Sequence, residues 1–155
     1  MQDVDNIVRK LQQQILEQAR KRYSETVIDH WMNIRNWGAM ENPNGHGKIK
    51  GPCGDTMEIF IRVRDGIIAE ARFMTDGCIT STASGSMTVE MATHKEISQA
   101  RAISQEDILE RLGGLPEESQ HCALLASNTL RVAIDDYLAT TKESWKKLYR
   151  PKSQR

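Results

Sequence analysis

The sequence contains few cysteines, no excess of charge of either sign and no long apolar run, and each shortage narrows the functions open to it. Its 155 residues include only three cysteines, without a C-x-x-C pair, so paired structural disulfides do not account for them. The 21 basic and 21 acidic side chains cancel, which argues against nucleic acid or a membrane as a partner. No apolar stretch approaches the roughly 20 residues that span a bilayer, and the N-terminus lacks the layout of a secretory signal. We therefore expect a cytoplasmic protein with free thiols.

The first 22 residues have the pattern of an amphipathic helix. Apolar residues recur every three or four positions from Val4 to about Arg22, as in a helix that packs by one stripe. Ser24 can cap a second, short helix that continues through Met32. We divide the chain into a helical extension (1–23), a main domain (24–140) and a basic C-terminal tail (141–155) that frays.

A β-hairpin is the clearest element of the main domain. Apolar and polar residues alternate from Met57 to Val63, Asp65-Gly66 turns the chain, and the alternation resumes from Ile67 to Phe73. A further strand can run from His46 to Lys50 within the glycine-rich segment before it. Because the strands are grouped rather than alternating with helices, the pattern predicts an α+β fold, with a small three-stranded antiparallel sheet packed against several helices.

Helices are expected to follow the hairpin. One begins at Cys78 and extends to Thr93. Ser104 with Asp107 resembles a capping box for a short helix, and Pro116 opens a longer one. His30 and His94 are interpreted as ordinary residues of helix surfaces or ends.

Each cysteine lies at a junction between these elements. Cys53 is in the Gly/Pro-rich loop before the hairpin, Cys78 starts a helix, and Cys122 follows His121 near the start of the last helix. A helix start favours thiolate over thiol, so we expect a lowered pKa at Cys78. The same is expected at Cys122 if it also lies at a helix start. Asp55 shares a face with Cys53 if the chain is extended there. Three thiolates and one harder ligand suit zinc or an iron–sulfur cluster, although buried cysteines of a core are the alternative.

Three motifs identify a family that fits this ligand set. Gly51-Pro52-Cys53-Gly54-Asp55, Asp76-Gly77-Cys78 and His121-Cys122, in this order, resemble the IscU/NifU-type iron–sulfur scaffold family over about residues 24–137. The resemblance implies a non-catalytic scaffold that builds a transient [2Fe–2S] cluster from Fe²⁺ and desulfurase-derived sulfur. It implies Cys53, Cys78 and Cys122 as ligands, Asp55 or His121 as the fourth, and Zn²⁺ as an occupant of the cluster-free form.

The same resemblance implies partners. A cysteine desulfurase would supply sulfur, acceptor apo-proteins would receive the cluster, and the chain would be a monomer or a homo-oligomer that shares a cluster. An Hsp70-type chaperone reads a Leu-Pro-Pro-Val-Lys motif in bacterial IscU proteins, but this chain has Leu115-Pro116-Glu117-Glu118-Ser119 there.

The residues after the second cysteine depart from the family pattern. Ile79-Thr80-Ser81 replaces a Gly-Ser-Ala run after the second cysteine, which predicts a branched apolar group beside the site.

The chief alternative function is that of the SufU branch, in which a zinc-bound thiolate, most plausibly Cys122, accepts and relays persulfide sulfur. SufU proteins typically carry an insertion between the second and third cysteines, and this chain lacks it.

Overall fold

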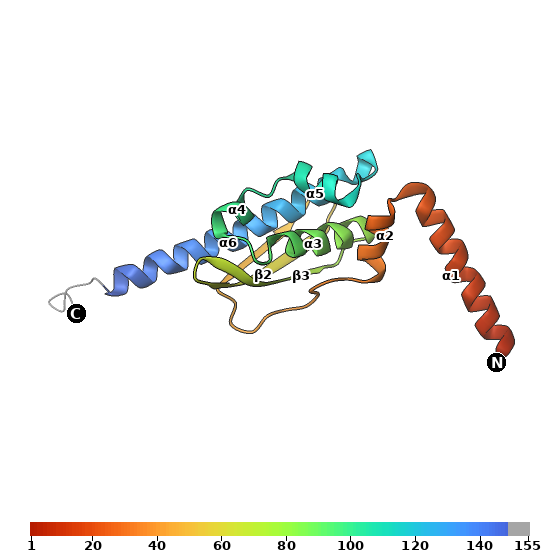
Figure 1. Cartoon of the computed structure of the whole chain (residues 1–155), viewed down its shortest axis with the longest axis horizontal. Helices are drawn as coiled ribbons and strands as arrows, with labels where there is room; N and C mark the ends of the chain where they lie inside the picture. The colour runs from red at the N-terminus through yellow and green to blue at the C-terminus, as the bar shows by residue number, and fades with distance from the viewer. Residues whose placement is uncertain (149–155) are drawn as a thin grey trace.

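The computed structural model describes residues 1–148, with side chains through residue 142, and it has the predicted α+β fold (Figure 1). No helix in this described part is both long and apolar enough to cross a membrane. In chain order the elements are α1 (Gln2–Arg22), α2 (Glu25–Met32), β1 (Gly45–Lys50), β2 (Thr56–Arg64), β3 (Ile67–Thr75), α3 (Ile79–Ala92), α4 (Ile97–Arg101), α5 (Gln105–Leu112), a 3₁₀ turn η1 (Glu117–Ser119) and α6 (Gln120–Leu148).

The three strands form one antiparallel sheet in the order β1-β2-β3. The β2–β3 hairpin turns at Asp65 and Gly66, which both have the positive φ that a type I′ turn requires. On one face, Met57, Ile59 and Ile61 of β2 are completely buried. The opposite face carries ion pairs, among them Lys48 with Glu58 at 3.2 Å. The alternation in the sequence therefore assigned the faces of β2 correctly from Met57 to Ile61. Beyond Arg62 it fails, because a bulge shifts the register, so that Ile68 is buried and Ile67 is 40% exposed.

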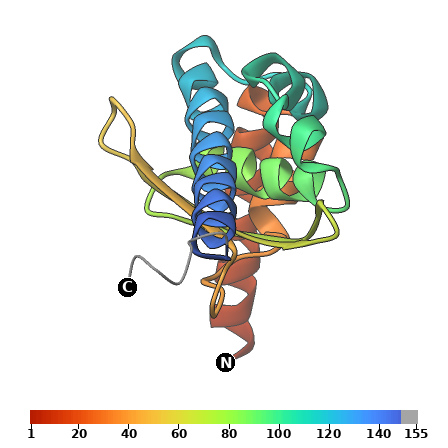
Figure 2. The same cartoon turned by 90° about the vertical axis from the view of Figure 1, so that its left-hand side faces the viewer.

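Helices α3 and α6 pack on the apolar face of the sheet, and α4 and α5 lie beyond them; Figure 2 shows the same layers along the long axis. Both contacts with the sheet depend on glycine. A Cβ at Gly47 of β1 would lie 2.5 Å from the carbonyl oxygen of Thr129 in α6. A Cβ at Gly85 of α3 would lie 2.4 Å from the ring of Phe73 in β3. These close approaches let both helices lie flat on the sheet and begin at the same end of the domain.

The helix termini largely follow the predicted signals. Ser24 accepts a hydrogen bond from the backbone N–H of Val27 at 3.1 Å, and Ser104 forms the expected capping box with Asp107. The sequence patterns missed α4, which has only five residues and no side-chain cap.

The last helix departs from its predicted limits at both ends. Pro116 precedes the 3₁₀ turn η1 rather than opening the helix directly, and α6 begins at Gln120. The helix then continues past the proposed domain boundary at residue 141 to Leu148, so this part of the predicted tail is helical. The remainder of that tail, from residue 149, lies outside the described residues.

Helix α1 stands apart from the rest of the fold and extends away from the sheet as an arm (Figure 1). None of its residues is buried, so the prediction that it packs by its apolar stripe is wrong for the single chain. Its base is attached to the domain, where Arg22 forms an ion pair with Glu118 of η1 and Arg20 forms one with Glu25 of α2.

Candidate metal centre

All five residues predicted for the site lie at one end of the domain. Cys53 and Asp55 come from the loop between β1 and β2, Cys78 is the N-cap of α3, and His121 and Cys122 are in the first turn of α6. Because α3 and α6 begin side by side, three segments that are far apart in the sequence meet there. Cys53 and Cys78 are exposed, whereas Cys122 is only 2% exposed.

His121 connects two of the thiols. Its Nε2 forms a contact with Sγ of Cys53 and lies 3.6 Å from Sγ of Cys122. The imidazole therefore lies between an exposed thiol on a loop and a buried thiol on a helix.

Two hydroxyl groups of α3 connect the other residues. The Thr80 hydroxyl lies 3.1 Å from Sγ of Cys78 and 3.4 Å from Sγ of Cys122. The Ser81 hydroxyl donates to Oδ2 of Asp55 at 2.7 Å and lies 3.4 Å from Sγ of Cys122. Together with His121, these contacts link all five predicted residues into one network.

The local backbone makes these contacts possible. The loop closes on itself, because the N–H of Gly51 donates to the carbonyl of Asp55 at 2.7 Å. At Gly77, an added Cβ would lie 2.5 Å from the Ser81 side chain and 2.7 Å from Oδ2 of Asp55. Only glycine therefore leaves room at this position for the Asp55–Ser81 hydrogen bond.

The two helix-start cysteines differ in acidity. Partial burial opposes ionisation of Cys78, but the Thr80 hydroxyl and the backbone N–H groups of Ser81 and Thr80 outweigh it, so the pKa of Cys78 is lowered as predicted. Burial raises the pKa of Cys122 even though Ser81 and Thr80 hydrogen-bond to it. The predicted lowering at Cys122 is therefore wrong, because desolvation at this buried position dominates over the helix start.

The donor set fits a soft metal ion in chemistry but is not yet arranged around one. Thiolate sulfur and imidazole nitrogen are ligands that zinc and iron–sulfur clusters accept. Among the residues that the structure describes, however, no three His, Cys, Asp or Glu side chains are already placed to hold an ion. Several of these donors instead hydrogen-bond to one another or to α3 hydroxyls. Side-chain rotation, easiest on the exposed Cys53 loop, would have to precede ligation.

Sequence reasoning missed the part that Thr80 and Ser81 play. It treated Ile79-Thr80-Ser81 as a bulkier replacement and predicted an apolar group beside the site. In the structure Ile79 packs against the hydrophobic core, while the next two residues contact the thiols. Their position directly after an N-capping cysteine was the available signal, because side chains in the first turn lie near the helix start.

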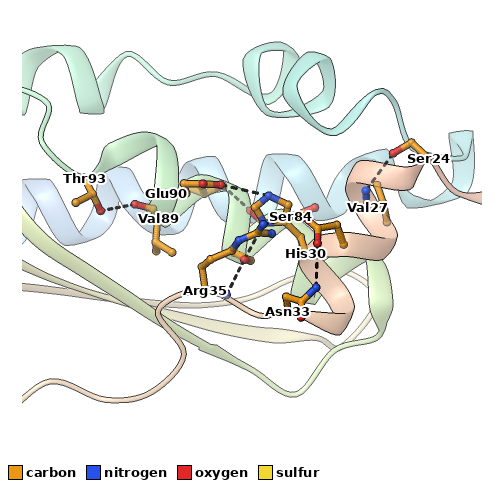
Figure 3. Close-up of polar contacts among 12 residues, drawn as sticks. Ser24, Val27, His30, Asn33, Arg35, Ser84, Val89, Glu90 and Thr93 are labelled. Carbon is orange, nitrogen blue, oxygen red and sulfur yellow. Dashed lines mark hydrogen bonds and ion pairs between the residues drawn. The ribbon is translucent and has the colours of Figure 1, made fainter.

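A buried histidine behind the site was also misassigned. His30 is 3% exposed rather than on a surface, and it joins α2 to α3 (Figure 3). Its Nδ1 lies 2.8 Å from the Ser86 hydroxyl and its Nε2 lies 3.2 Å from Oε2 of Glu90. Burial, followed by the nearby Arg35, lowers the pKa of His30.

This lowered pKa predicts a pH-dependent stability. Below the ordinary histidine pKa of about 6.5, the unfolded chain takes up a proton that folded His30 resists, so the free energy of unfolding should fall as the pH drops from 7 toward 5. Urea unfolding across this range should show a weaker pH dependence in His30→Gln than in the wild type. His94→Gln, at an exposed position, is the matched control. Equal pH dependence in wild type and His30→Gln would contradict the assignment.

Comparison with known proteins agrees with this fold and identifies a family. A sequence model described as the NifU-like N terminal domain matches residues 22–144. The chain is 45% identical over 116 residues to iron-sulfur cluster assembly scaffold protein IscU 1 of Archaeoglobus fulgidus, covering 74% of this chain and 76% of that protein. It is 44% identical over 120 residues to IscU of Escherichia coli strain K12, covering 74% and 93%.

Solved structures show the same fold. A NifU-like protein (N-terminal) from Brucella abortus superposes with a TM-score of 0.62 at 16% identity, over 75% of this chain and 94% of that one. A putative scaffold protein for the SUF system from Fervidobacterium islandicum superposes with a TM-score of 0.59 at 23% identity, over 72% and 96%.

The fold and the three-thiol site define a small α+β domain of the iron–sulfur scaffold type. The chain belongs to the NifU-like N-terminal domain family, which the three cysteine motifs had indicated. The matched residues begin at 22, so almost all of α1 lies outside the family domain.

Proposed function

We propose that this chain is a scaffold on which an iron–sulfur cluster is assembled and from which it is transferred to acceptor apo-proteins. The observation that carries the proposal is the convergence of three thiols, an imidazole and a carboxylate from three chain segments at one end of the domain. Relatives at 44–45% identity that are named IscU scaffold proteins support it.

The proposed cargo is a [2Fe–2S] cluster held by Cys53, Cys78 and Cys122, with Asp55 or His121 as the fourth ligand. In this assignment Cys122 is the fixed ligand, because it is buried in a helix that packs on the sheet. Cys53 and Cys78 form the exposed edge. An exposed edge is what transfer requires, because an acceptor protein must reach the cluster to remove it.

The two candidate fourth ligands differ in their present contacts. His121 already lies between two thiols, whereas the carboxylate of Asp55 is turned to Ser81. Either oxygen or imidazole nitrogen would hold iron less firmly than a fourth thiolate, which favours displacement during transfer. Zn²⁺ suits the same donors in the cluster-free protein.

The proposed partners follow from the cargo. A cysteine desulfurase supplies sulfur, and the exposed Cys78, with its lowered pKa, is the thiol best prepared to react or bind first. An Hsp70-type chaperone that reads the segment from Leu115 to Ser119 would have to accept two carboxylates, one of which already pairs with Arg22.

Anaerobic reconstitution of the purified apo-protein with ferrous iron and sulfide tests the proposal. We expect equal amounts of iron and acid-labile sulfide, visible charge-transfer bands, and transfer of both to an apo-ferredoxin. Failure to form a cluster while zinc stays bound and a desulfurase loads persulfide onto a cysteine would instead favour the sulfur-relay function. The solved structure named for the SUF system does not favour that alternative, because it is itself named a scaffold protein and its 23% identity supports only the fold.

A further inference from the structure

Helix α1 presents an apolar stripe that the single chain does not cover. Five aliphatic side chains are exposed along it: Val4 at 62%, Ile7 at 57%, Val8 at 45%, Leu11 at 52% and Ile15 at 54%. Most of the stability of helices in proteins comes from packing of an amphipathic face. A partner that buries this stripe would therefore stabilise α1.

The spacing of these residues indicates a coiled-coil seam. In one heptad register, Val8 and Ile15 take the first seam position (a), and Val4 and Leu11 take the second (d). β-Branched residues at a with leucine at d favour two parallel strands, a pattern that Val8, Leu11 and Ile15 follow, whereas Val4 places a valine at d. A parallel pair would also bring Ile7 beside Gln12 and Gln14 beside Ala19 of the second helix, so no like charges oppose each other across these flanks.

We propose that α1 is a dimerisation element that pairs in parallel with α1 of a second copy of this chain. The seam is apolar from Val4 to Ile15 and becomes polar at Gln18 and Arg22. Contact therefore ends before the base of the helix, where Arg22 pairs with Glu118 of its own chain.

A lipid surface fits the stripe less well. Helix α1 has no aromatic residue, and three acidic side chains, Asp3, Asp5 and Glu17, interrupt its basic ones. Interfacial helices typically combine a strongly basic polar face with aromatic or leucine anchors. The dimer does not depend on the scaffold function, because a metal-free chain could form it.

Sedimentation equilibrium of the full-length apo-protein, in reductant and chelator, tests the dimer without bridging by metal or disulfide. Over a wide concentration range, the wild type should reach twice the 17.6 kDa mass of one chain. Leu11→Glu, which places a charge in the seam, should remain monomeric while keeping the unfolding transition of the main domain. Gln13→Glu adds the same charge on the outer face of α1 and should still dimerise.

The direction of pairing has its own measurement. In a parallel dimer Val4 faces its own counterpart, whereas in an antiparallel seam it faces Ile15 of the other chain. Oxidation of Val4→Cys should therefore yield a symmetric disulfide between the two N-terminal peptides, identified by mass spectrometry after digestion. Absence of this peptide from a dimeric Val4→Cys sample would overturn the parallel arrangement.

Other outcomes would overturn the dimer itself. These are a wild type that stays monomeric at every concentration, and a Leu11→Glu variant that dimerises like the wild type. A monomeric wild type that binds anionic vesicles, with binding lost in Leu11→Glu, would assign the stripe to lipid instead.

Discussion

Serine in place of Cys122 is expected to prevent stable cluster formation, and Cys53→Ser and Cys78→Ser should each leave a cluster that forms poorly or decays quickly. Serine has nearly the shape of cysteine, so the fold should survive the change. Its hydroxyl oxygen is a much poorer ligand than thiolate for iron in a sulfide cluster. Cys122 should be most sensitive because it is buried and no second thiol can readily take its place.

The measurement is iron and sulfide per chain after anaerobic reconstitution, with the visible spectrum followed over time. Unfolding curves of the metal-free variants show whether a loss is local to the site. A variant that keeps wild-type iron, sulfide and spectrum would remove that cysteine from the ligand set. If all three variants did so, the proposed three-cysteine site would be wrong.

Much of this site could be predicted because its parts are marked locally. The Asp65-Gly66 turn and the alternation around it define the hairpin, and the end of the hairpin places Cys78 at a helix start. Convergence of the three cysteines needed one further inference, that the helices after the sheet lie on its apolar face. Gly47 and Gly85 permit that packing, but their role depends on partners distant in the sequence.

The features that sequence reasoning missed depend on long-range burial. His30 occurs in an eight-residue helix whose own pattern does not show what covers it, and α3 buries it. Cys122 has the local signature of an acidic thiol, yet the surrounding core raises its pKa. The stripe of α1 shows the opposite error, because a clear amphipathic pattern predicts that a partner exists without showing that it lies in the same chain.

The Ser81 hydroxyl lies outside the three cysteine motifs. Of the site groups outside those motifs, it is the one whose removal should change metal affinity most. It is fully buried and lies between Asp55 and Cys122, at 2.7 Å from the carboxylate and 3.4 Å from the thiol. A hydroxyl has one proton to donate, so it cannot serve both acceptors fully at the same time. While the shorter bond to Asp55 persists, it fixes the orientation of this carboxylate through Oδ2.

Ser81→Ala is therefore expected to weaken Zn²⁺ binding by on the order of 10-fold, as the loss of groups that orient metal ligands typically does. Competition with a chromophoric chelator measures this affinity without cluster transfer or any partner protein. Ser98→Ala, at an exposed serine of α4, is the matched control and should bind zinc like the wild type. Unchanged affinity in Ser81→Ala would show that the hydroxyl only fills space.

A double-mutant cycle with Asp55→Ala separates the two acceptors of Ser81. If the hydroxyl acts through the carboxylate, adding Ser81→Ala to Asp55→Ala should change zinc affinity little, because the oriented group is already gone. An equally large further loss would instead indicate that Ser81 acts through Cys122. The first result would make Asp55 a ligand that α3 holds in position, and the second would leave His121, already between two thiols, as the better candidate for the fourth ligand.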